Sequence, residues 1–218
     1  MSKYEFSQIK DKLFAPCILD ILDSLGYRNQ GMDYQMRPLI VNDQKIMGRA
    51  FTLMAAEVYE IPAEPYKNEL NALDRMQEGD IMVATTQGSM GSAFFGELMA
   101  TRCAVRKVTG AVIDGCTRDT AFIERMGFPL FCRGINPLDS MGRMDVIADS
   151  VPIVCGGVLV KPGDVIYADR DGIAVIPANI LDDVIEKTLE KLSMEDIVRD
   201  EIKKGMSATD VYAKYHVL

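Results

Sequence analysis

Residues 110–129, GAVIDGCTRDTAFIERMGFP, contain the side chains whose types and spacing point most directly to chemistry. An apolar run ends at Asp114-Gly115, and Arg118 and Asp119 stand just before a predicted helix. Arg can bind a carboxylate through two parallel hydrogen bonds, and Asp is a ligand for hard divalent cations. Because α/β folds place ligands in the loops after strand C-termini, this pair is a candidate binding site. A surface ion pair or a helix cap would use the same residues.

Histidine chemistry is nearly absent, because the chain has one histidine, His216, two residues from the C-terminus. Ser-His-Asp catalysis and HExxH zinc sites are therefore excluded unless His216 folds into a site, which we do not expect. The five cysteines are scattered without a CxxC pair, which indicates reduced thiols rather than a disulfide framework. Cys116 lies close to the Arg-Asp pair, but we expect it to be a small buried side chain.

Several other polar residues have a structural interpretation that competes with a functional one. Asp169 and Asp171 lie in a predicted hairpin turn, where Asp-Gly is first a turn signal. We expect Asp114 to support the site loop rather than to react, and Arg133 is either a second anion contact or a surface charge. The Gly/Ser loop at 85–92 lacks the lysine of a phosphate-binding P-loop.

Composition narrows the class of protein. The chain has 218 residues, 48% hydrophobic residues and a formal net charge of −8. This charge argues against general nucleic-acid binding, which needs a basic surface. No stretch reaches the roughly 18 consecutive apolar residues of a membrane helix. The opening residues, MSKYEFSQIK, have no apolar signal-peptide core. We expect a cytoplasmic protein with neither a nucleic-acid nor a membrane partner.

Hydrophobic periodicity predicts one compact α/β domain over residues 1–218, with strands and helices alternating through its middle. The second half is rich in β-strands and ends in helices. The KPGD and DRDG sequences resemble hairpin connections. Helices are predicted at 15–25, 65–76, 93–107 and 120–126, and one or two further helices are predicted within 179–204. Strands are predicted at 39–41, 48–54, 81–84, 110–114, 129–133, 152–160, 164–168 and 173–177, with loops at 85–92 and 116–119.

Eight segments, taken in this order, resemble the 4-hydroxy-4-methyl-2-oxoglutarate aldolase family, which has a non-aldolase relative in RraA, a regulator of ribonuclease E. The segments are ILDILDSLGY, IMGRAFTL, EGDIMVA, FFGELMATRCA, VIDGCTRD, GFPLFCRGINP, KPGDVIYADRDGIAVIP and SMEDIVRDEIKKG. The resemblance covers nearly the whole chain. It implies a layered αββα sandwich that assembles as a homotrimer or homohexamer with sites between subunits.

The resemblance also implies roles for individual residues. Arg118 would hold the carboxylate of a pyruvyl group, and Asp119 would be the one direct protein ligand of a Mg²⁺ or Mn²⁺ ion. Glu195 is similar to a glutamate that the family contributes to a neighbouring subunit's site. RraA keeps the arginine and lacks the metal-binding aspartate, so the intact pair favours an enzyme.

The segment Gly96-Glu97-Leu98-Met99 resembles the family's Gly-acid-Leu-Leu turn, in which backbone N–H groups at a helix start bind an anionic oxygen. Its acidic residue would orient water on the metal. Glu97 stands where the typical aldolases have Asp, which leaves the exact substrate open. A water held by Glu97 and Glu195 would take the proton of the substrate hydroxyl.

The expected function is therefore that of a divalent-metal-dependent lyase. It would cleave a 4-hydroxy-2-oxo acid, such as 4-hydroxy-4-methyl-2-oxoglutarate, to pyruvate through a metal-stabilised enolate. The same chemistry would decarboxylate oxaloacetate as a side activity. One alternative is a non-catalytic RraA-type regulator that acts by protein–protein binding. Another is a Schiff-base aldolase that uses Lys107 or Lys161. A methyltransferase is disfavoured, because the first half lacks a glycine-rich cofactor fingerprint.

Overall fold

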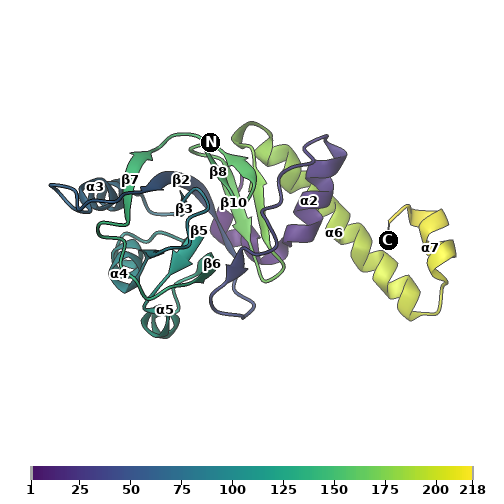
Figure 1. Cartoon of the computed structure of the whole chain (residues 1–218). Coiled ribbons are helices and arrows are strands. Elements are labelled where there is room, and N and C mark those ends of the chain that lie inside the picture. The colour runs from purple at the N-terminus through teal and green to yellow at the C-terminus, as the bar shows by residue number, and fades with distance from the viewer. Residues whose placement is uncertain (1, 218) are drawn as a thin grey trace.

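The protein folds around one large mixed β-sheet that curls back on itself (Figure 1), as seen in a computed structural model that describes residues 2–217. The strands within that range follow the order β1-β6-β5-β3-β2-β10-β11, with β4 paired to β5 and β7 paired to β2. The sheet consists of β1 (Arg37–Pro38), β2 (Ile46–Glu57), β3 (Asp80–Thr85), β4 (Ala93–Phe95), β5 (Gly110–Thr117), β6 (Leu130–Ile135), β7 (Met144–Asp149), β10 (Val165–Ala168) and β11 (Ile173–Ile176). A separate hairpin pairs β8 (Ile153–Cys155) with β9 (Val158–Val160).

Helices cover both outer faces of the curled sheet (Figure 1). They are α1 (Phe6–Ile9), α2 (Ala15–Ser24), α3 (Lys67–Arg75), α4 (Glu97–Val105), α5 (Thr120–Met126), α6 (Leu181–Lys203) and α7 (Ala208–Tyr215), with short 3₁₀ turns at Lys10–Lys12 and Ala178–Ile180. Among residues 2–217, no helix is both long and apolar enough to cross a membrane.

The central strands are buried on both faces, as parallel strands covered by helices usually are. In β3, Met82 and Ala84 pack toward the cluster beneath α3, α4 and α5. Ile81 and Val83 point the other way, into a cluster shared with β8, β9, β10 and β11. The alternation of side chains along the strand therefore assigns each apolar residue to one of two cores.

Three apolar clusters lie one after another across the molecule, and each fills the space between two neighbouring layers. The first lies between α3–α5 and β3, β5 and β6, and the second lies inside the curl of the sheet. The third packs α1, α2 and α6 on the outer face of β10 and β11. The order is helices, sheet, sheet, helices, so the αββα prediction is confirmed. A single continuous sheet supplies both β layers.

Two predicted boundaries next to the Arg-Asp pair were wrong. The helix predicted from residue 93 begins at Glu97, because Ala93–Phe95 form strand β4 beside β5. The predicted loop at 116–119 is shorter, since β5 continues to Thr117. Side chains of all three β4 residues are buried, and burial of consecutive apolar residues overrode their helical spacing.

Other differences lie in the second half and in the first strand. The strand predicted at 39–41 is a two-residue pairing at Arg37–Pro38. The KPGD turn does not close a hairpin, because β9 pairs with β8 whereas β10 pairs with β2 and β11. Strand β7 and helix α7 were not predicted. The DRDG turn does join the antiparallel pair β10 and β11, as expected.

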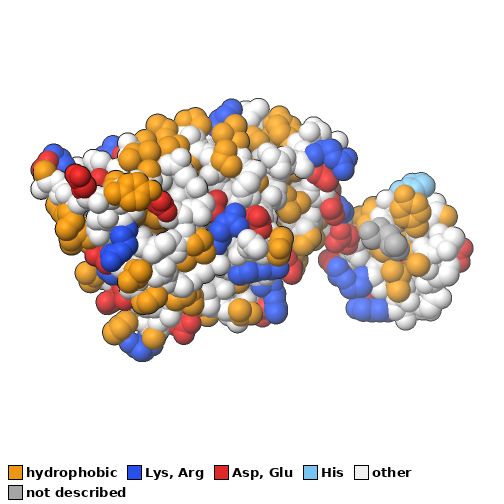
Figure 2. Space-filling model, viewed as in Figure 1, with side chains coloured by type: hydrophobic (Ala, Val, Ile, Leu, Met, Phe, Trp, Pro, Cys, Tyr) orange, Lys and Arg blue, Asp and Glu red, His pale blue; other side chains and the backbone are white. Residues whose placement is uncertain are grey.

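The last two helices extend beyond the layered body (Figure 1). Helix α6 packs its first part against α2, and its second part leads to α7 at a distance from the sheet. Acidic and basic side chains gather on the stretch of α6 between the body and α7 (Figure 2). Together, α6 and α7 form an arm that extends from the layered body (Figure 1).

Candidate active site

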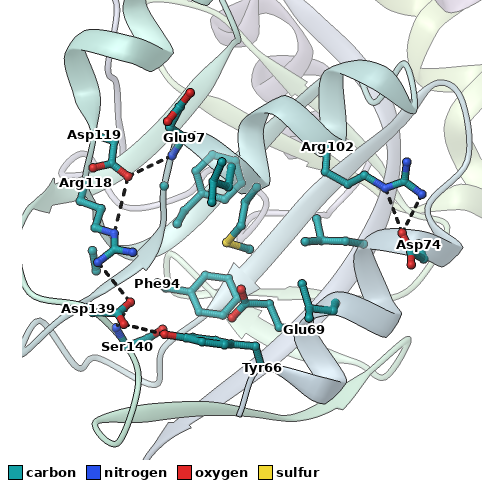
Figure 3. A pocket seen from close by; sticks show the side chains of 17 residues that line it. Tyr66, Glu69, Asp74, Phe94, Glu97, Arg102, Arg118, Asp119, Asp139 and Ser140 are labelled. Atoms are coloured by element: carbon teal, nitrogen blue, oxygen red, sulfur yellow. Dashed lines mark hydrogen bonds and ion pairs between the residues drawn. The ribbon is translucent and has the colours of Figure 1, made fainter. Parts of the chain in front are cut away.

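A cavity of about 680 Å³ opens where β4, α4 and the end of β5 meet α3 (Figure 3). Its lining residues come from four separate stretches of chain. They are Tyr66, Glu69, Leu70, Leu73, Asp74, Ala93, Phe94, Phe95, Gly96, Glu97, Leu98, Met99, Arg102, Arg118, Asp119, Asp139 and Ser140. The cavity therefore contains Arg118 and Asp119 together with the whole predicted turn 96–99.

Strand pairing positions Arg118 and Asp119 at the end of β5. The backbone N–H of Arg118 donates to the carbonyl of Phe95 at 2.9 Å, and the Thr117 hydroxyl donates to the same carbonyl at 2.9 Å. Asp119 then adopts a left-handed conformation with φ 56° before α5 begins. A left-handed conformation costs energy in most non-glycine residues, and Asp is one of the few that adopt it at single positions. Here it turns the Asp119 side chain away from α5.

The Asp119 carboxylate caps α4 rather than its own helix. Its Oδ2 accepts a hydrogen bond from the backbone N–H of Glu97 at 3.2 Å, whereas α5 has no side-chain cap. Gly96 makes this approach possible, because a Cβ at position 96 would lie 2.8 Å from Asp119 Oδ2 and 3.3 Å from Arg118 Cγ. Asp119 is therefore a helix cap, as one interpretation of the sequence allowed, but it caps α4 rather than the helix that follows it. The same carboxylate also lines the cavity.

The start of α4 presents further hydrogen-bond donors. Ala100 N–H bonds back to Gly96 at 3.1 Å, but within the described chain no acceptor is recorded for the N–H groups of Leu98 and Met99. Unpaired N–H groups in a first helical turn, together with the helix dipole, favour an anion. The cavity therefore offers donors for a carboxylate from both α4 and Arg118.

Arg118 is held by two carboxylates of the cavity wall. Its Nη1 lies 3.1 Å from Asp139 Oδ1, and its Nε lies 3.6 Å from Asp119 Oδ2. The Tyr66 hydroxyl donates to the other Asp139 oxygen at 2.5 Å. Burial, followed by this hydrogen bond, raises the pKa of Tyr66 to about 12. Tyr66 therefore stays protonated at neutral pH and fixes Asp139 beside the guanidinium.

Glu69 is a cavity residue that the sequence analysis missed. It projects from α3 toward the space beside Phe94 and Tyr66 (Figure 3). Burial, with smaller contributions from Asp139 and Asp145 against the opposing charge of Arg118, raises the pKa of Glu69 to about 7. No local sequence pattern marks Glu69 as a cavity residue, because a single Glu in a polar helical segment is usually exposed to solvent.

Glu195, by contrast, is not part of this cavity within its own chain. It lies on α6, where its Oε1 is 3.7 Å from Lys191 Nζ. The expectation that Glu195 reaches a neighbouring subunit's site concerns an assembly and remains a prediction. Glu97 lines the cavity, but its carboxylate points away from the Arg118 guanidinium (Figure 3).

The donor set at Asp119 can be compared with the needs of a divalent cation. Among the described residues, no group of three or more His, Cys, Asp or Glu side chains is arranged to enclose a metal. The fitting ion is one that keeps several waters and accepts a single carboxylate, which is how Mg²⁺ commonly binds. The Asp119 carboxylate, held beside the cavity by the Gly96 approach, suits this role.

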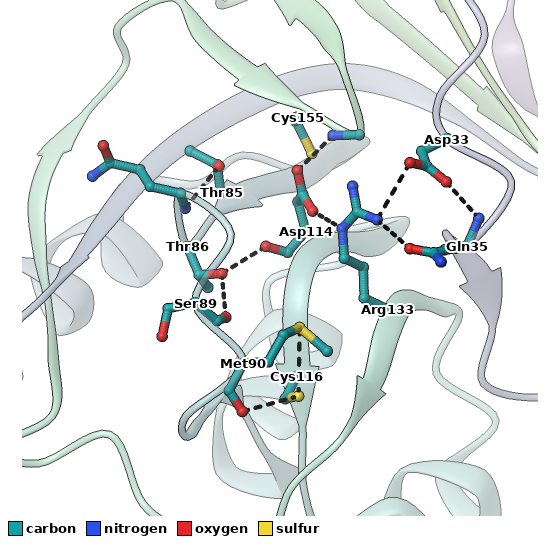
Figure 4. A network of polar contacts seen from close by, with 12 residues as sticks. Asp33, Gln35, Thr85, Thr86, Ser89, Met90, Asp114, Cys116, Arg133 and Cys155 are labelled. Carbon is teal, nitrogen blue, oxygen red and sulfur yellow. Dashed lines mark hydrogen bonds and ion pairs between the residues drawn. The ribbon is translucent and has the colours of Figure 1, made fainter.

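A second polar network lies further back along β5 (Figure 4). Buried Asp114 pairs with Arg133 and accepts the Gly156 N–H at 2.7 Å, so it ties β5 to the β8–β9 turn. Arg133 also bonds Gln35 at 3.0 Å and lines a different cavity from Arg118. Asp114 therefore supports the fold at this point, as expected, and Arg133 is not among the described residues that line the Arg118 cavity.

No lysine or cysteine lies among the described residues that line the cavity. Lys107 pairs with Glu78 at 3.0 Å on the surface, and within residues 2–217 neither it nor Lys161 lines the cavity. All five cysteines are free and buried, as expected for reduced thiols. Burial raises the pKa of the Cys116 thiol, which fits a small buried side chain.

Comparison with known proteins gives one family. The family model described as RraA-like, Aldolase/RraA, matches residues 15–175. A protein of Halalkalibacterium halodurans named "Putative 4-hydroxy-4-methyl-2-oxoglutarate aldolase" is 30% identical over 196 residues, which is 90% of this chain and 88% of that protein. Protein DlpA of Legionella pneumophila is 27% identical over 91% of this chain, but the chain spans only 32% of DlpA.

A solved structure agrees with the same fold. Streptomyces coelicolor RraAS2, titled an unusual member of the RNase ES inhibitor RraA protein family, superposes with a TM-score of 0.80 at 25% identity. The match covers 92% of this chain and all of that one. Relatives of this chain thus include proteins named for catalysis and proteins named for inhibition.

Proposed function

This chain belongs to the RraA-like aldolase/RraA family, and from that premise we propose that it is a divalent-metal-dependent carbon–carbon lyase that cleaves a 4-hydroxy-2-oxo acid and releases pyruvate. The observation that carries the proposal is the meeting of Arg118, Asp119 and the start of α4 in one cavity around Gly96. Relatives named as 4-hydroxy-4-methyl-2-oxoglutarate aldolases support the reaction class.

The chain's own residues account for substrate positioning. Arg118 offers a planar fork for the carboxylate of the pyruvyl group. The N–H groups of Leu98 and Met99, at the positive end of the α4 dipole, would donate hydrogen bonds to the same carboxylate. With the carboxylate held from two sides, the rest of the substrate would extend toward the apolar side chains of the cavity wall, such as Phe94 and Met99.

Asp119 is the residue that would hold Mg²⁺ or Mn²⁺. Bound there, the ion would supply Lewis acidity that stabilises the negative charge developing on the pyruvyl fragment as the carbon–carbon bond breaks. Glu97, and Glu195 from a neighbouring subunit, would orient water that takes the proton of the substrate hydroxyl. Oxaloacetate decarboxylation, which develops charge at the same position, is proposed as a side activity.

The test is pyruvate release, coupled to lactate dehydrogenase, from 4-hydroxy-4-methyl-2-oxoglutarate and from oxaloacetate. We expect release with Mg²⁺ or Mn²⁺, loss of release with EDTA, and recovery when metal is added back. Release that continues unchanged in EDTA would refute the metal-dependent mechanism. A covalent adduct trapped by borohydride with pyruvate would replace it with a Schiff-base mechanism.

The second candidate is a binding protein that inhibits an RNase by contact. It is favoured by the similarity to Streptomyces coelicolor RraAS2 over its full length. A folded oligomer that releases no pyruvate from any 4-hydroxy-2-oxo acid and gains no thermal stability from Mg²⁺ and pyruvate would support this candidate over the lyase.

A further inference from the structure

The wall of the cavity that faces Arg118 and Asp119 is largely apolar. Leu70 and Leu73 contribute from α3, Phe94 and Phe95 from β4, and Met99 from α4. Four of these side chains are nearly inaccessible to solvent, and only Leu70 is largely exposed. A group bound here is removed from water, so an ionic group would lose its hydration unless an opposite charge met it.

The cations of the described lining are already paired. Arg118 is the cation assigned to the pyruvyl carboxylate. Arg102, at the rim, donates from Nε at 2.9 Å and from Nη2 at 2.7 Å to the same oxygen of Asp74. Neither guanidinium is left over for a second carboxylate of the substrate.

Negative groups, in contrast, face the apolar space. Asp139 is bonded to Tyr66 and lies beside Arg118, and Glu69 has no hydrogen-bond partner recorded within residues 2–217. The charged and titratable groups around Glu69 are Tyr66 on its own helix segment, Asp139 before β7, Asp145 on β7 and Arg118 after β5. Two of these four groups, Asp139 and Asp145, are carboxylates that oppose ionisation of Glu69, so they also repel an added anion.

Resting on the lyase function proposed above, we propose that Glu69 determines specificity and that the substrate is a 2-oxo acid with a single carboxylate and an apolar, uncharged group beyond C4. The pyruvyl carboxylate then occupies the Arg118 end of the cavity. The remainder of the substrate packs on Leu73, Phe94 and Met99. A dicarboxylate would place its second charge beside Glu69 and Asp139, where like charges in a partly buried space repel.

This arrangement makes the discrimination depend on pH. Because burial raises the pKa of Glu69 to about 7, the side chain is protonated below that pH and can donate a hydrogen bond to a second carboxylate. Above it, the ionised side chain repels the same group. Preference for the monocarboxylate should therefore rise with pH through neutrality. Oxaloacetate, whose second carboxylate lies at C4, should remain a weak substrate for the same reason.

The test uses two substrates that differ at one group. 4-Hydroxy-4-methyl-2-oxoglutarate yields two pyruvates on cleavage, whereas 4-hydroxy-4-methyl-2-oxopentanoate, with a methyl group in place of the distal carboxylate, yields one pyruvate and acetone. The readout is the ratio of kcat/KM for the monocarboxylate to that for the dicarboxylate. Intrinsic reactivity of the two compounds cancels when this ratio is compared between variants and pH values.

For Glu69→Gln we expect the ratio at about pH 8 to fall on the order of tenfold, mainly through a lower KM for the dicarboxylate, and its pH dependence to disappear. Glu64→Gln is the matched control, because Glu64 lies outside the cavity and pairs with Lys67 at 2.5 Å. A ratio that favours the dicarboxylate and is unchanged in Glu69→Gln would overturn the inference. The inference would also be overturned if Arg102→Ala lowered kcat/KM for the dicarboxylate alone, because Arg102 would then bind the second carboxylate.

Calorimetric binding separates this inference from the lyase proposal. The probes are 2-oxo-4-methylpentanoate and 2-oxoglutarate, titrated into the folded protein with Mg²⁺. We expect the monocarboxylate to bind on the order of tenfold more tightly, and Glu69→Gln to strengthen 2-oxoglutarate binding selectively. That result without pyruvate release would refute the lyase function and leave the ligand class standing. Tighter binding of 2-oxoglutarate to the unaltered protein would refute the ligand class.

Discussion

Asp119 serves two purposes at the scale of a single residue. Its carboxylate caps α4 through the Glu97 N–H, and the same group is the proposed ligand of the cation. Asn at this position would keep an oxygen that accepts the cap hydrogen bond while removing the charge that a divalent cation requires. The two purposes can therefore be separated by a conservative substitution.

Asp119→Asn should reduce metal-dependent pyruvate release on the order of 100-fold or more, with little change in stability. Asp119→Ala should lose activity and, in addition, about 1 kcal/mol of stability, because α4 loses its cap. Steady-state kinetics and denaturant unfolding of both variants make the comparison. If Asp119→Asn retained full activity, Asp119 would not be the metal ligand.

Gly96 is required by close approach rather than by an unusual backbone angle. Gly96→Ala would bring a Cβ to 2.8 Å from Asp119 Oδ2, so the carboxylate must move. We expect at least a tenfold loss of kcat/KM, as is typical when a catalytic group is displaced by about 1 Å. Gly172→Ala is the matched control, because a Cβ there meets nothing within 4 Å. Equal activity in the two variants would argue against a tight Gly96–Asp119 contact.

Glu69 should also affect stability. Its pKa in the folded state, about 7, lies above its ordinary value of 4.5, so the folded state holds the proton more tightly than the unfolded chain. The stabilising effect of the protonated group is complete below about pH 4.5 and is lost as pH rises through about 7. Glu69→Gln should therefore raise the free energy of unfolding at about pH 8, by up to about 3 kcal/mol, and much less at about pH 5. Urea unfolding at both pH values tests this, and a gain that is larger at the lower pH would contradict it.

At the scale of elements, Asp169 joins two segments that are far apart in sequence. This buried carboxylate accepts the Ala15 N–H at the start of α2 at 2.8 Å. Its other oxygen accepts the Asp171 and Gly172 N–H groups at 2.9 and 3.3 Å. Asp169 thus closes the β10–β11 turn and anchors α2, with no part in the cavity. The turn interpretation made from the sequence is correct for this residue.

Asp169→Ala should lower the free energy of unfolding by roughly 2–4 kcal/mol, because it removes a helix cap and leaves buried N–H groups unpaired. The kcat/KM of the remaining folded enzyme should be unchanged. Thermal unfolding and kinetics at a temperature well below the transition measure the two effects separately. A selective loss of activity in a stable variant would instead indicate a functional role for Asp169.

At the scale of the whole molecule, Glu195 lies on α6 and does not line the Arg118 cavity of its own chain. The arm of α6 and α7 extends away from the layered body (Figure 1). The predicted homotrimer or homohexamer would let this arm reach a neighbouring cavity. A closed ring of identical subunits requires each copy to give and receive the same contact. This arrangement can be tested without a structure of the assembly.

Mixing Asp119→Asn with Glu195→Gln subunits, each inactive alone, should restore about a quarter of the normal activity after random reassembly. Half of the sites would have an intact Asp119, and half of these would receive an intact Glu195 from a neighbour. Light scattering should show a trimer or hexamer for the single variants and for the mixture. No recovery in a mixed oligomer would mean that Glu195 does not complete a neighbour's site.

Much about this protein follows from the sequence by itself. Spacing of apolar residues predicted α2, α5 and the buried strands β3, β5, β10 and β11. This works because a helix or strand that is buried on one or two faces carries apolar residues at regular intervals in its sequence. The order of short motifs indicated the family, and the loop after β5 pointed to Arg118 and Asp119. Local features of this kind depend on neighbours in sequence.

Only the tertiary structure decided what surrounds the Arg-Asp pair. Strand β4 forms because its residues, including Phe95, pair with β5. Asp119 caps α4 because the first residue of α4, Glu97, lies beside its carboxylate. Glu69 enters the cavity because α3 and β4, which are about 25 residues apart in sequence, pack into the same apolar cluster and line the same cavity. Such contacts depend on burial and electrostatics summed over the folded chain, and no local pattern records them.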